Sequence, residues 1–335
     1  MKTKFNPNTD IPDLSDKVIF ITGGSAFSLW SKSKMSTISP MSSNHAGTAG
    51  LGKESICTLA KHSPEHIYFS GRDSAKAAAV IDEVRATTPN AKLTFIECDL
   101  ASLPSIEKAA QKFLGESQRL DILMCNAGVM ALPPGLTHDE YEVQFGINHM
   151  GHAFLVALFL PTLLRTAEEL GSDVRVVFLT SLGYGLHPKG GIEFASLRTT
   201  QKNIGPAGTW RRYGQSKLAN ILYAAELARR YPSITAVSVH PGVIATGLVG
   251  NLSFMNKALV YLTNVGRMTT PAEGSWNQLW AATSEKKNIV NGAFYEPVGA
   301  LGRHDKESQS STLAAELWEW TETELKRFQA QESSS

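Results

Sequence analysis

Short runs of β-branched and aromatic residues alternate along the chain with longer segments whose apolar residues recur at helical spacing. The first run, 18–21, is typical of a buried strand, and the segment 51–61 predicts a helix. The pattern predicts further strands at 66–70, 92–98, 120–125, 174–180, 234–239 and 293–295, and helices at 74–86, 102–117, 139–170, 212–230 and 310–328. Because strand and helix alternate at short intervals, we expect one α/β domain over 14–330, with a doubly wound parallel sheet of about seven strands and helices on both faces. Residues 329–335 are expected to form a flexible tail.

Composition and charge narrow the class of protein. The 335 residues are 42% hydrophobic and 19% charged, which is enough apolar material for a packed core. With 32 Lys and Arg against 31 Asp and Glu there is no basic excess, so no nucleic-acid partner is expected. Three cysteines without paired spacing, and no secretory signal, predict a cytoplasmic protein. The most apolar run, 153–164, is shorter than the roughly 20 residues of a membrane span, so no transmembrane segment is expected.

The first strand leads into a loop that carries glycines on both sides of an interruption. Glycines here let the backbone approach a pyrophosphate, and the following helix N-terminus supplies N–H groups, as in Rossmann-type dinucleotide sites. The candidate cofactor-binding residues of the loop are Thr22, Gly23, Gly24, Gly50, Leu51 and Gly52. Without residues 25–47 the loop reads T-G-x-x-x-G-x-G.

The interrupting segment 25–47 has eight serines, no acidic residue and no regular period. One interpretation is a translated, retained intron, because its end can be back-translated into a branch-like element and an acceptor in frame. The other is a genuine surface insertion that bulges away from the phosphate loop. An insertion that does not bulge away is expected to lower cofactor affinity.

Small and polar residues follow the ends of the later predicted strands, where a parallel sheet opens to a ligand crevice. They include the turn 126–128, Ser181 with its neighbour Thr180, and the pair 241–242. Because neighbouring strand residues point to opposite faces, only one of the two hydroxyls can serve a site, and we favour Ser181.

Tyr213 and Lys217 are four apart and share one helix face. A phenol can pass a proton to the alkoxide left by hydride transfer, and a nearby ammonium favours the phenolate.

In this order, these motifs resemble the short-chain dehydrogenase/reductase family over roughly residues 14–300. The retinol-dehydrogenase-like and fungal secondary-metabolite branch is the most similar. The resemblance implies an oxidoreductase, and it makes Ser181, Tyr213, Lys217 and Asn148 the catalytic residues. The resemblance also implies that Lys217 binds the nicotinamide ribose hydroxyls and that Asn148 holds a water on the route to Lys217. The cofactor-binding residues that it implies are Asp99 on the adenine amino group, Asn126, Ala127, Gly128, Tyr213, Lys217, Pro241, Gly242 and Thr246.

A residue shortly after the second predicted strand bears on which nicotinamide cofactor is used. Enzymes that bind NAD carry an acid there for the ribose hydroxyls, whereas this chain has Arg72. A guanidinium suits a 2′-phosphate, which predicts NADP(H). Asp73, one place further on, could repel that phosphate.

The substrate and the alternatives follow from weaker signals. Apolar and aromatic residues in 182–210 and 248–276 predict a lipophilic carbonyl or secondary alcohol, and the fungal resemblance suggests secondary metabolism. An inactive or cofactor-sensing relative impaired by the insert is an alternative, and an epimerase is a more remote one.

His149 and His152 invite a metal interpretation, but no third ligand is near in sequence, so no metal is expected. Homo-oligomer formation through the helices at 139–170 and 212–230 stays open.

Overall fold

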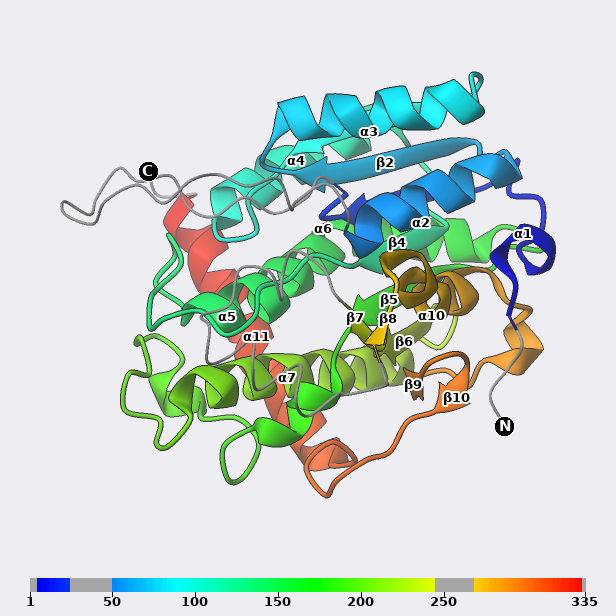
Figure 1. The fold of residues 1–335 in the computed structure, drawn as a ribbon. Coiled ribbons are helices and arrows are strands. Elements are labelled where there is room, and N and C mark those ends of the chain that lie inside the picture. The colour runs from blue at the N-terminus through cyan, green and yellow to red at the C-terminus, as the bar shows by residue number, and fades with distance from the viewer. Residues whose placement is uncertain (1–4, 25–49, 245–267, 333–335) are drawn as a thin grey trace, which may run out of the picture.

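A sheet of eight strands runs through the part of the chain that the computed structural model describes, residues 5–24, 50–244 and 268–332 (Figure 1). The strand order is β10-β9-β6-β5-β4-β1-β2-β3. These strands are β1 Val18–Thr22, β2 His66–Gly71, β3 Leu93–Glu97, β4 Ile122–Cys125, β5 Arg175–Leu179, β6 Thr235–Val239, β9 Phe294–Glu296 and β10 Ala300–Leu301. All neighbours pair in parallel except β9 and β10, so the expected doubly wound fold is confirmed.

The strand order reverses between β1 and β4. The chain passes from β1 to β2 and β3 on one side, then returns to place β4 on the other side of β1. In doubly wound sheets the crevice beyond the carboxyl ends at such a switch point is where ligands bind. The two-residue strand β10, absent from the sequence analysis, is too short to show a hydrophobic period.

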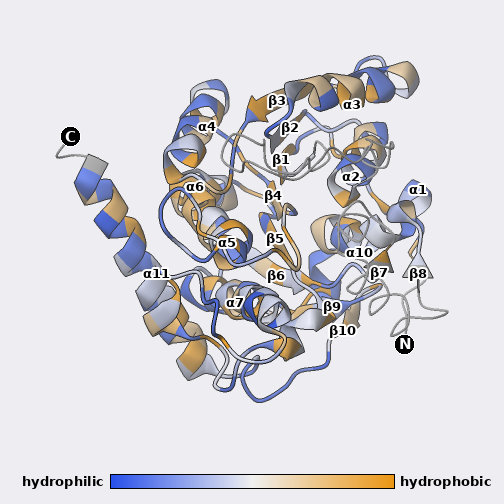
Figure 2. Cartoon of the chain, turned by 60° about the vertical axis from the view of Figure 1, so that its left-hand side comes forward, coloured by the Kyte–Doolittle hydropathy of each residue, from blue (hydrophilic) through white to orange (hydrophobic). Residues whose placement is uncertain are grey.

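Helices cover both faces of the sheet. The larger ones are α2 Leu51–Leu59, α3 Ser74–Thr87, α4 Leu103–Glu116, α6 Gly151–Glu168, α7 Gly208–Arg230, α10 Pro271–Thr283 and α11 Ser311–Glu332. One hydrophobic core lies between the sheet and α4, α6 and α7, and a second lies between the sheet and α2, α3 and α10. Hydrophobic residues accordingly follow the strands and the helix faces turned toward them (Figure 2). Trp318 of α11 stacks on Tyr223 of α7 with ring centres 4.8 Å apart, so α11 forms an outer layer over α7.

Several boundaries differ from those expected. The helix expected at 139–170 spans Val143–Glu168, continues through Pro161 and contains a π-helical turn, η2, at Gly146–Met150. Helix α11 continues to Glu332, so residues 329–332 are helical rather than part of a flexible tail. The chain before residue 14 also belongs to the fold, because Phe5 and Ile11 are buried beside the second core. These differences arise from tertiary packing, which extends or recruits segments of weak intrinsic preference.

The stretch Val143–Glu168 is long and apolar enough to cross a membrane by length and composition. However, 72% of its most apolar window is buried inside the fold. Its side chains pack with α4 and the sheet, and Phe154, Phe159 and Leu163 have no exposed surface. We therefore assign it as a core helix.

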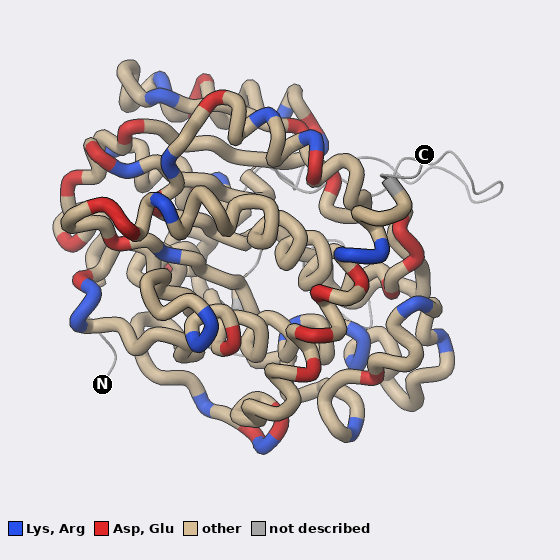
Figure 3. Tube along the Cα trace, turned by 180° about the vertical axis from the view of Figure 1, so that it is seen from behind, with Lys and Arg blue, Asp and Glu red and all other residues tan. Residues whose placement is uncertain are grey.

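Lys and Arg are interspersed with Asp and Glu along the described part of the chain (Figure 3). This distribution matches the near balance of 32 basic and 31 acidic residues. A fully buried exception is Asp121, whose carboxylate pairs with Arg119 at 2.7 Å and accepts the Val18 N–H at 3.0 Å. A buried carboxylate is stable only when it is paired and hydrogen-bonded. Through its bond to Val18, Asp121 therefore holds the start of β1 in place.

Candidate active site

Thr22 ends β1 at the switch point of the sheet. Its hydroxyl accepts hydrogen bonds from the backbone N–H groups of Asn126 and Ala127, both at 3.0 Å. Its carbonyl accepts another from the Asn126 side-chain amide at 2.8 Å. The turn after β4 is therefore fastened to the end of β1, beside the expected ligand crevice.

Glycines allow the two flanks of the interrupting segment to meet. Gly23 has φ of +73°, and a Cβ on it would lie 2.9 Å from the Cβ of Ala127. A Cβ on Gly52 would lie 2.5 Å from the Gly23 carbonyl oxygen, and one on Gly24 would lie 2.6 Å from Ile56. Contacts this short leave no room for a side chain. Helix α2 can therefore begin directly against β1, as a phosphate-binding loop requires.

The N-terminus of α2 fits a phosphate group. Gly50 is its N-cap residue, and no side chain of the described residues bonds to the first N–H groups. By contrast, Asp73 caps α3 and Ser102 caps α4. A Cβ on Gly50 would meet nothing within 4 Å among the described residues. Uncapped N–H groups at a helix N-terminus suit an anion such as a pyrophosphate, to which Leu51 and Gly52 would contribute.

Arg72 and Asp99 lie together beyond the ends of β2 and β3. The Arg72 Nη1 and Asp99 Oδ2 atoms are 3.9 Å apart, and each side chain is 31% exposed. Asp73, the acid expected to disturb a 2′-phosphate, caps α3 by accepting the Lys76 N–H at 3.0 Å. It also pairs with the Lys76 ammonium at 3.5 Å. The negative charge of Asp73 is therefore balanced by Lys76 and by the positive end of the helix.

The two hydroxyls after β5 have different partners. Thr180 is buried and donates to the Lys217 carbonyl at 2.7 Å. Ser181 precedes the short helix η3, Leu182–Leu186, and its Oγ accepts the Gly183 N–H at 3.1 Å. A Cβ on the neighbouring Gly183 would lie 3.4 Å from Ser181 Oγ and 2.9 Å from the Tyr213 ring, so Ser181 and Tyr213 flank the same glycine. Of the two, Ser181 is thus the one beside the candidate proton donor.

Tyr213 and Lys217 lie on α7, and each is only 5% exposed. The Lys217 Nζ lies 6.0 Å from the centre of the Tyr213 ring and donates to the Leu179 carbonyl at 3.0 Å. Burial raises the pKa of Tyr213 to about 12, and the nearby Ser181 side chain offsets only part of this rise. Burial also lowers the pKa of Lys217 to about 7. In the chain alone, desolvation therefore outweighs the influence expected of the Lys217 ammonium, and the Tyr213 phenol keeps its proton at neutral pH.

The lowered pKa of Lys217 predicts pH-dependent cofactor binding. Lys217 is charged below pH 7 and loses its charge above it, so we expect the Kd for NADPH to rise roughly tenfold between pH 7 and 8.5. Titration calorimetry at several pH values measures this. Lys217→Arg keeps a positive charge over the whole range, so its Kd should lack the rise, even if binding is weaker throughout. The same pH dependence in both proteins would contradict this role of Lys217.

Asn148 lies in the π-helical turn η2, an element often found at functional sites. Its Oδ1 accepts the Val129 N–H at 2.8 Å, and its Nδ2 donates to Ser216 Oγ at 2.9 Å. A Cβ on Gly128 would lie 2.9 Å from Asn148 Oδ1 and 3.3 Å from Lys217 Nζ. The fold therefore brings Asn148 and Lys217 to the same glycine of the turn after β4.

His152 connects two site residues, a role the sequence analysis did not identify. Its Nδ1 lies 3.0 Å from the Asn148 carbonyl and its Nε2 lies 2.8 Å from Thr22 Oγ1. Because a carbonyl only accepts, Nδ1 carries the hydrogen. Burial lowers the pKa of His152 to about 4, so the ring is neutral and Nε2 accepts from the Thr22 hydroxyl. His149 instead bonds Thr321 of α11 at 3.0 Å. The available signal was the four-residue spacing from Asn148, which places His152 one helical turn away.

Helix α10 supports the site and was also absent from the sequence analysis. Gln278 Nε2 donates to Asn126 Oδ1 at 3.2 Å and to Ser55 Oγ of α2 at 2.7 Å. The helix begins with a capping box in which Thr270 and Glu273 bond each other reciprocally. That capping box, followed by apolar residues, is the sequence signal that would have predicted α10.

Pro241 and Gly242 follow β6, as expected. The turn is held by Asn277 of α10, whose amide donates to the His240 carbonyl at 2.7 Å. Gly242 has φ of +94°, which favours glycine. The chain then enters β7, Val243–Ile244, which pairs with β8, Met268–Thr269. Thr246, the segment 25–47 and most of the predicted specificity stretch 248–276 lie outside the described residues.

A helix N-terminus without a side-chain cap can hold a pyrophosphate, and a buried phenol beside a serine hydroxyl can exchange a proton with a substrate oxygen. On a doubly wound sheet, this combination defines the class of nicotinamide-dependent oxidoreductases. Comparison with known proteins narrows the class. The chain belongs to the short-chain dehydrogenase/reductase family, which confirms the predicted resemblance.

Three similarities and one family match support this assignment. A family model described as short chain dehydrogenase matches residues 45–193. A short-chain dehydrogenase/reductase of Aspergillus calidoustus is 33% identical over 330 residues, covering 95% of this chain and 96% of the relative. Retinol dehydrogenase 11 of Homo sapiens is 34% identical over 273 residues, covering 81% of this chain and 80% of the relative. The crystal structure of an uncharacterized protein from Mycobacterium paratuberculosis is similar with a TM-score of 0.68 and 25% identity, covering 97% of this chain and 98% of that one.

Proposed function

We propose that this oxidoreductase uses NADP(H) to transfer hydride to or from a lipophilic carbonyl or secondary alcohol. The observation that carries the proposal is the close approach of Ser181 and Tyr213 at Gly183, with Lys217 one turn further along the helix of Tyr213. This group lies beyond the carboxyl end of β5, next to the strands whose ends form the switch point. The proposed role in secondary metabolism rests on the fungal relatives alone.

The chain's own residues supply proton transfer and binding, while NADP(H) supplies or accepts the hydride. Tyr213 holds its proton at neutral pH, so it can donate this proton to the substrate oxygen in reduction. Ser181 donates a hydrogen bond to the same oxygen as negative charge develops there. Lys217 binds the nicotinamide ribose, and the N-terminus of α2 binds the pyrophosphate.

The preference for NADP(H) rests on Arg72. This guanidinium follows β2, where the adenosine ribose binds in doubly wound folds. Asp73, the nearby acid, is occupied as the N-cap of α3 and paired with Lys76, so it does not leave an unbalanced negative charge facing a phosphate. Asp99 lies 3.9 Å from Arg72 and would orient it from the side of β3.

Replacing Arg72 by alanine should weaken NADPH binding about 10- to 100-fold, because a charged hydrogen bond is worth about 1.5–3 kcal/mol. NADH binding should stay within about twofold, because NADH lacks the 2′-phosphate. Calorimetric titration of both cofactors measures the effect. Arg85→Ala, in the last turn of α3, is the matched control and should bind both cofactors as the unchanged chain does. An equal loss of NADH and NADPH affinity in Arg72→Ala would contradict the assignment.

The proposal of a lipophilic substrate is supported by the loop after Ser181. Leu182 and Leu186 of η3 are 38% and 50% exposed, although both are large apolar side chains. The Trp210 ring lies 6.1 Å from the Tyr213 ring in an edge contact. Tyr184, also in this stretch, is instead buried against Phe294 of the core. Exposed leucines close to the candidate site are typical of a binding surface for an apolar ligand.

The alternative is a relative that binds the cofactor without turnover. The two are distinguished by following NADPH absorbance with a panel of lipophilic ketones and aldehydes, and by titrating NADPH without substrate. Oxidation of NADPH that depends on a carbonyl supports the proposal. Tight NADPH binding without turnover over the whole panel would favour a cofactor-sensing protein.

We also propose where the protein is located in the cell and which part of α7 two copies would use to associate. A cytoplasmic location is supported by Cys57, Cys98 and Cys125, which are all free thiols. If the chain self-associates through α7, it must do so on the part of that helix that Trp318 and the rest of α11 leave uncovered.

A further inference from the structure

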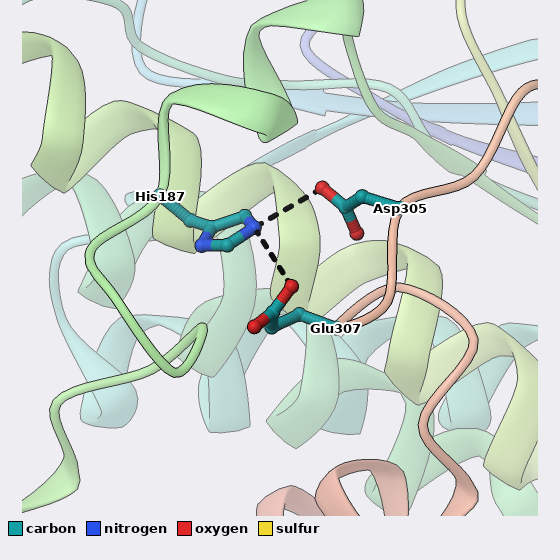
Figure 4. Close-up of side chains that lie close together, drawn as sticks. All are labelled: His187, Asp305 and Glu307. Atoms are coloured by element: carbon teal, nitrogen blue, oxygen red, sulfur yellow. Dashed lines mark hydrogen bonds and ion pairs between the residues drawn. The ribbon is translucent and has the colours of Figure 1, made fainter.

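We propose that His187, Asp305 and Glu307 form a binding site for one divalent transition-metal ion, with Zn²⁺ as the best fit (Figure 4). The His187 Nε2 atom lies 3.1 Å from Asp305 Oδ2 and 3.9 Å from Glu307 Oε2. The three ligand atoms all lie within 4.8 Å of one another. Two ligands of a tetrahedral zinc ion, each at about 2.1 Å, lie about 3.4 Å apart. One ion therefore fits between these side chains after small movements.

The contact of the other ring nitrogen of His187 shows which nitrogen is available to bind an ion. Its Nδ1 lies 2.6 Å from the carbonyl oxygen of Pro188, which can only accept a hydrogen bond, so Nδ1 carries a hydrogen. Nε2 is therefore the nitrogen that would lose its hydrogen and present a lone pair to an ion held between the two carboxylates, which otherwise accept from it. A backbone carbonyl on the second nitrogen is the arrangement that orients histidines bound to metals.

Charge balance favours a metal ion over a protonated histidine. A neutral His187 with a divalent cation exactly offsets the two carboxylates, whereas an imidazolium leaves one negative charge uncompensated. Among the described residues, no lysine or arginine forms an ion pair with Asp305 or Glu307. Arg303, close by in sequence, is paired with Glu296 at 3.2 Å.

The ligands are held in place but stay accessible. The His187 side chain is 10% exposed, and those of Asp305 and Glu307 are 34% and 27% exposed, which leaves room for a water as fourth ligand. The Ser308 N–H donates to Asp305 Oδ1 at 2.8 Å, so Oδ2 stays directed at His187. One imidazole with two carboxylates suits Zn²⁺ or, more weakly, Mn²⁺, whereas Mg²⁺ and Ca²⁺ prefer oxygen ligands alone.

The ion would connect two segments far apart in the sequence. His187 follows η3, the helix that Ser181 begins, and both carboxylates belong to the segment between β10 and α11. The Tyr184 hydroxyl already donates to the Arg303 carbonyl at 2.7 Å, between the same two segments. Bound metal would therefore brace the loop after Ser181 and stabilise the folded chain. This inference does not depend on the proposed function.

The test uses the full-length, tag-free protein after removal of metal with a chelator. Equilibrium dialysis against Zn²⁺ should give one ion per chain that His187→Gln and Asp305→Asn both lose. Zn²⁺ at about 100 times its Kd should raise the thermal midpoint of the unchanged protein by roughly 5 °C, and Mg²⁺ should not. Neither measurement needs cofactor or substrate.

His66→Gln is the matched control. His66 is also partly buried, but it bonds Thr94 at 2.9 Å on the far part of the sheet. This variant should keep the full thermal shift and the bound ion. The proposal is overturned if the unchanged protein binds no Zn²⁺, or if His66→Gln loses as much as His187→Gln. It is also overturned if His187→Gln lowers the thermal midpoint equally with and without Zn²⁺, since His187 would then act only as an ion-pair partner.

Discussion

Tyr213→Phe is expected to reduce NADPH-dependent carbonyl reduction about 1,000-fold, because a positioned general acid typically contributes 10²- to 10⁴-fold to the rate. Tyr213 lies beside Ser181 at Gly183, and burial keeps its phenol protonated at neutral pH. Phenylalanine retains the ring and its packing but has no proton to give. The turnover number on the best substrate of the carbonyl panel measures the loss.

Two controls separate proton transfer from folding. Tyr68→Phe removes a hydroxyl from a tyrosine of β2 that is 3% exposed and packs against Phe113 at 4.9 Å, and it should keep the rate within about twofold. The Kd of Tyr213→Phe for NADPH should also change by less than about threefold. A Tyr213→Phe protein that keeps more than a tenth of the rate would show that another group donates the proton.

Deleting residues 25–47 is expected to stabilise the chain by about 2 kcal/mol and to strengthen NADPH binding at least tenfold. The fold already holds the two flanks together, since a Cβ on Gly52 would lie 2.5 Å from the Gly23 carbonyl oxygen. Closing a loop of 26 residues, 25–50, rather than three costs about 2 kcal/mol more in chain entropy. The shortened loop also restores the continuous T-G-x-x-x-G-x-G motif at the phosphate site. Urea unfolding and NADPH calorimetry on both forms measure the two effects.

The outcome also decides between the two interpretations of this segment. Tight binding by the shortened form alone, with a transcript that lacks the 23 codons, supports a retained intron. Equal binding by both forms, with all 23 codons in the mature transcript, means that the segment is a genuine insertion that leaves the phosphate loop intact. If neither form binds NADPH while both unfold cooperatively, the cofactor assignment itself is wrong.

Much of the proposed site could be predicted because its chemistry is carried by local motifs. Tyr213 and Lys217 are one helical turn apart, and the glycines of the first loop follow a recognisable strand. Partners far apart in sequence could not be predicted in this way. His152 reaches Thr22 across 130 residues, and Gln278 of α10 reaches Asn126 across 152. Such pairs depend on how helices pack across the sheet, which no short pattern encodes.

By itself, the sequence determined the strand and helix pattern, the doubly wound class and the identity of the family, because hydrophobic period, turn residues and motif spacing are local properties of the chain. Only the tertiary structure decided the protonation of the site. Burial raises the pKa of Tyr213 and lowers that of Lys217, against the expectation from their spacing alone. The tertiary structure also brought His187 to the carboxylates of Asp305 and Glu307, more than 100 residues further along the chain. Desolvation and long-range proximity arise from the packing of the whole fold, and the sequence pattern around one residue does not contain them.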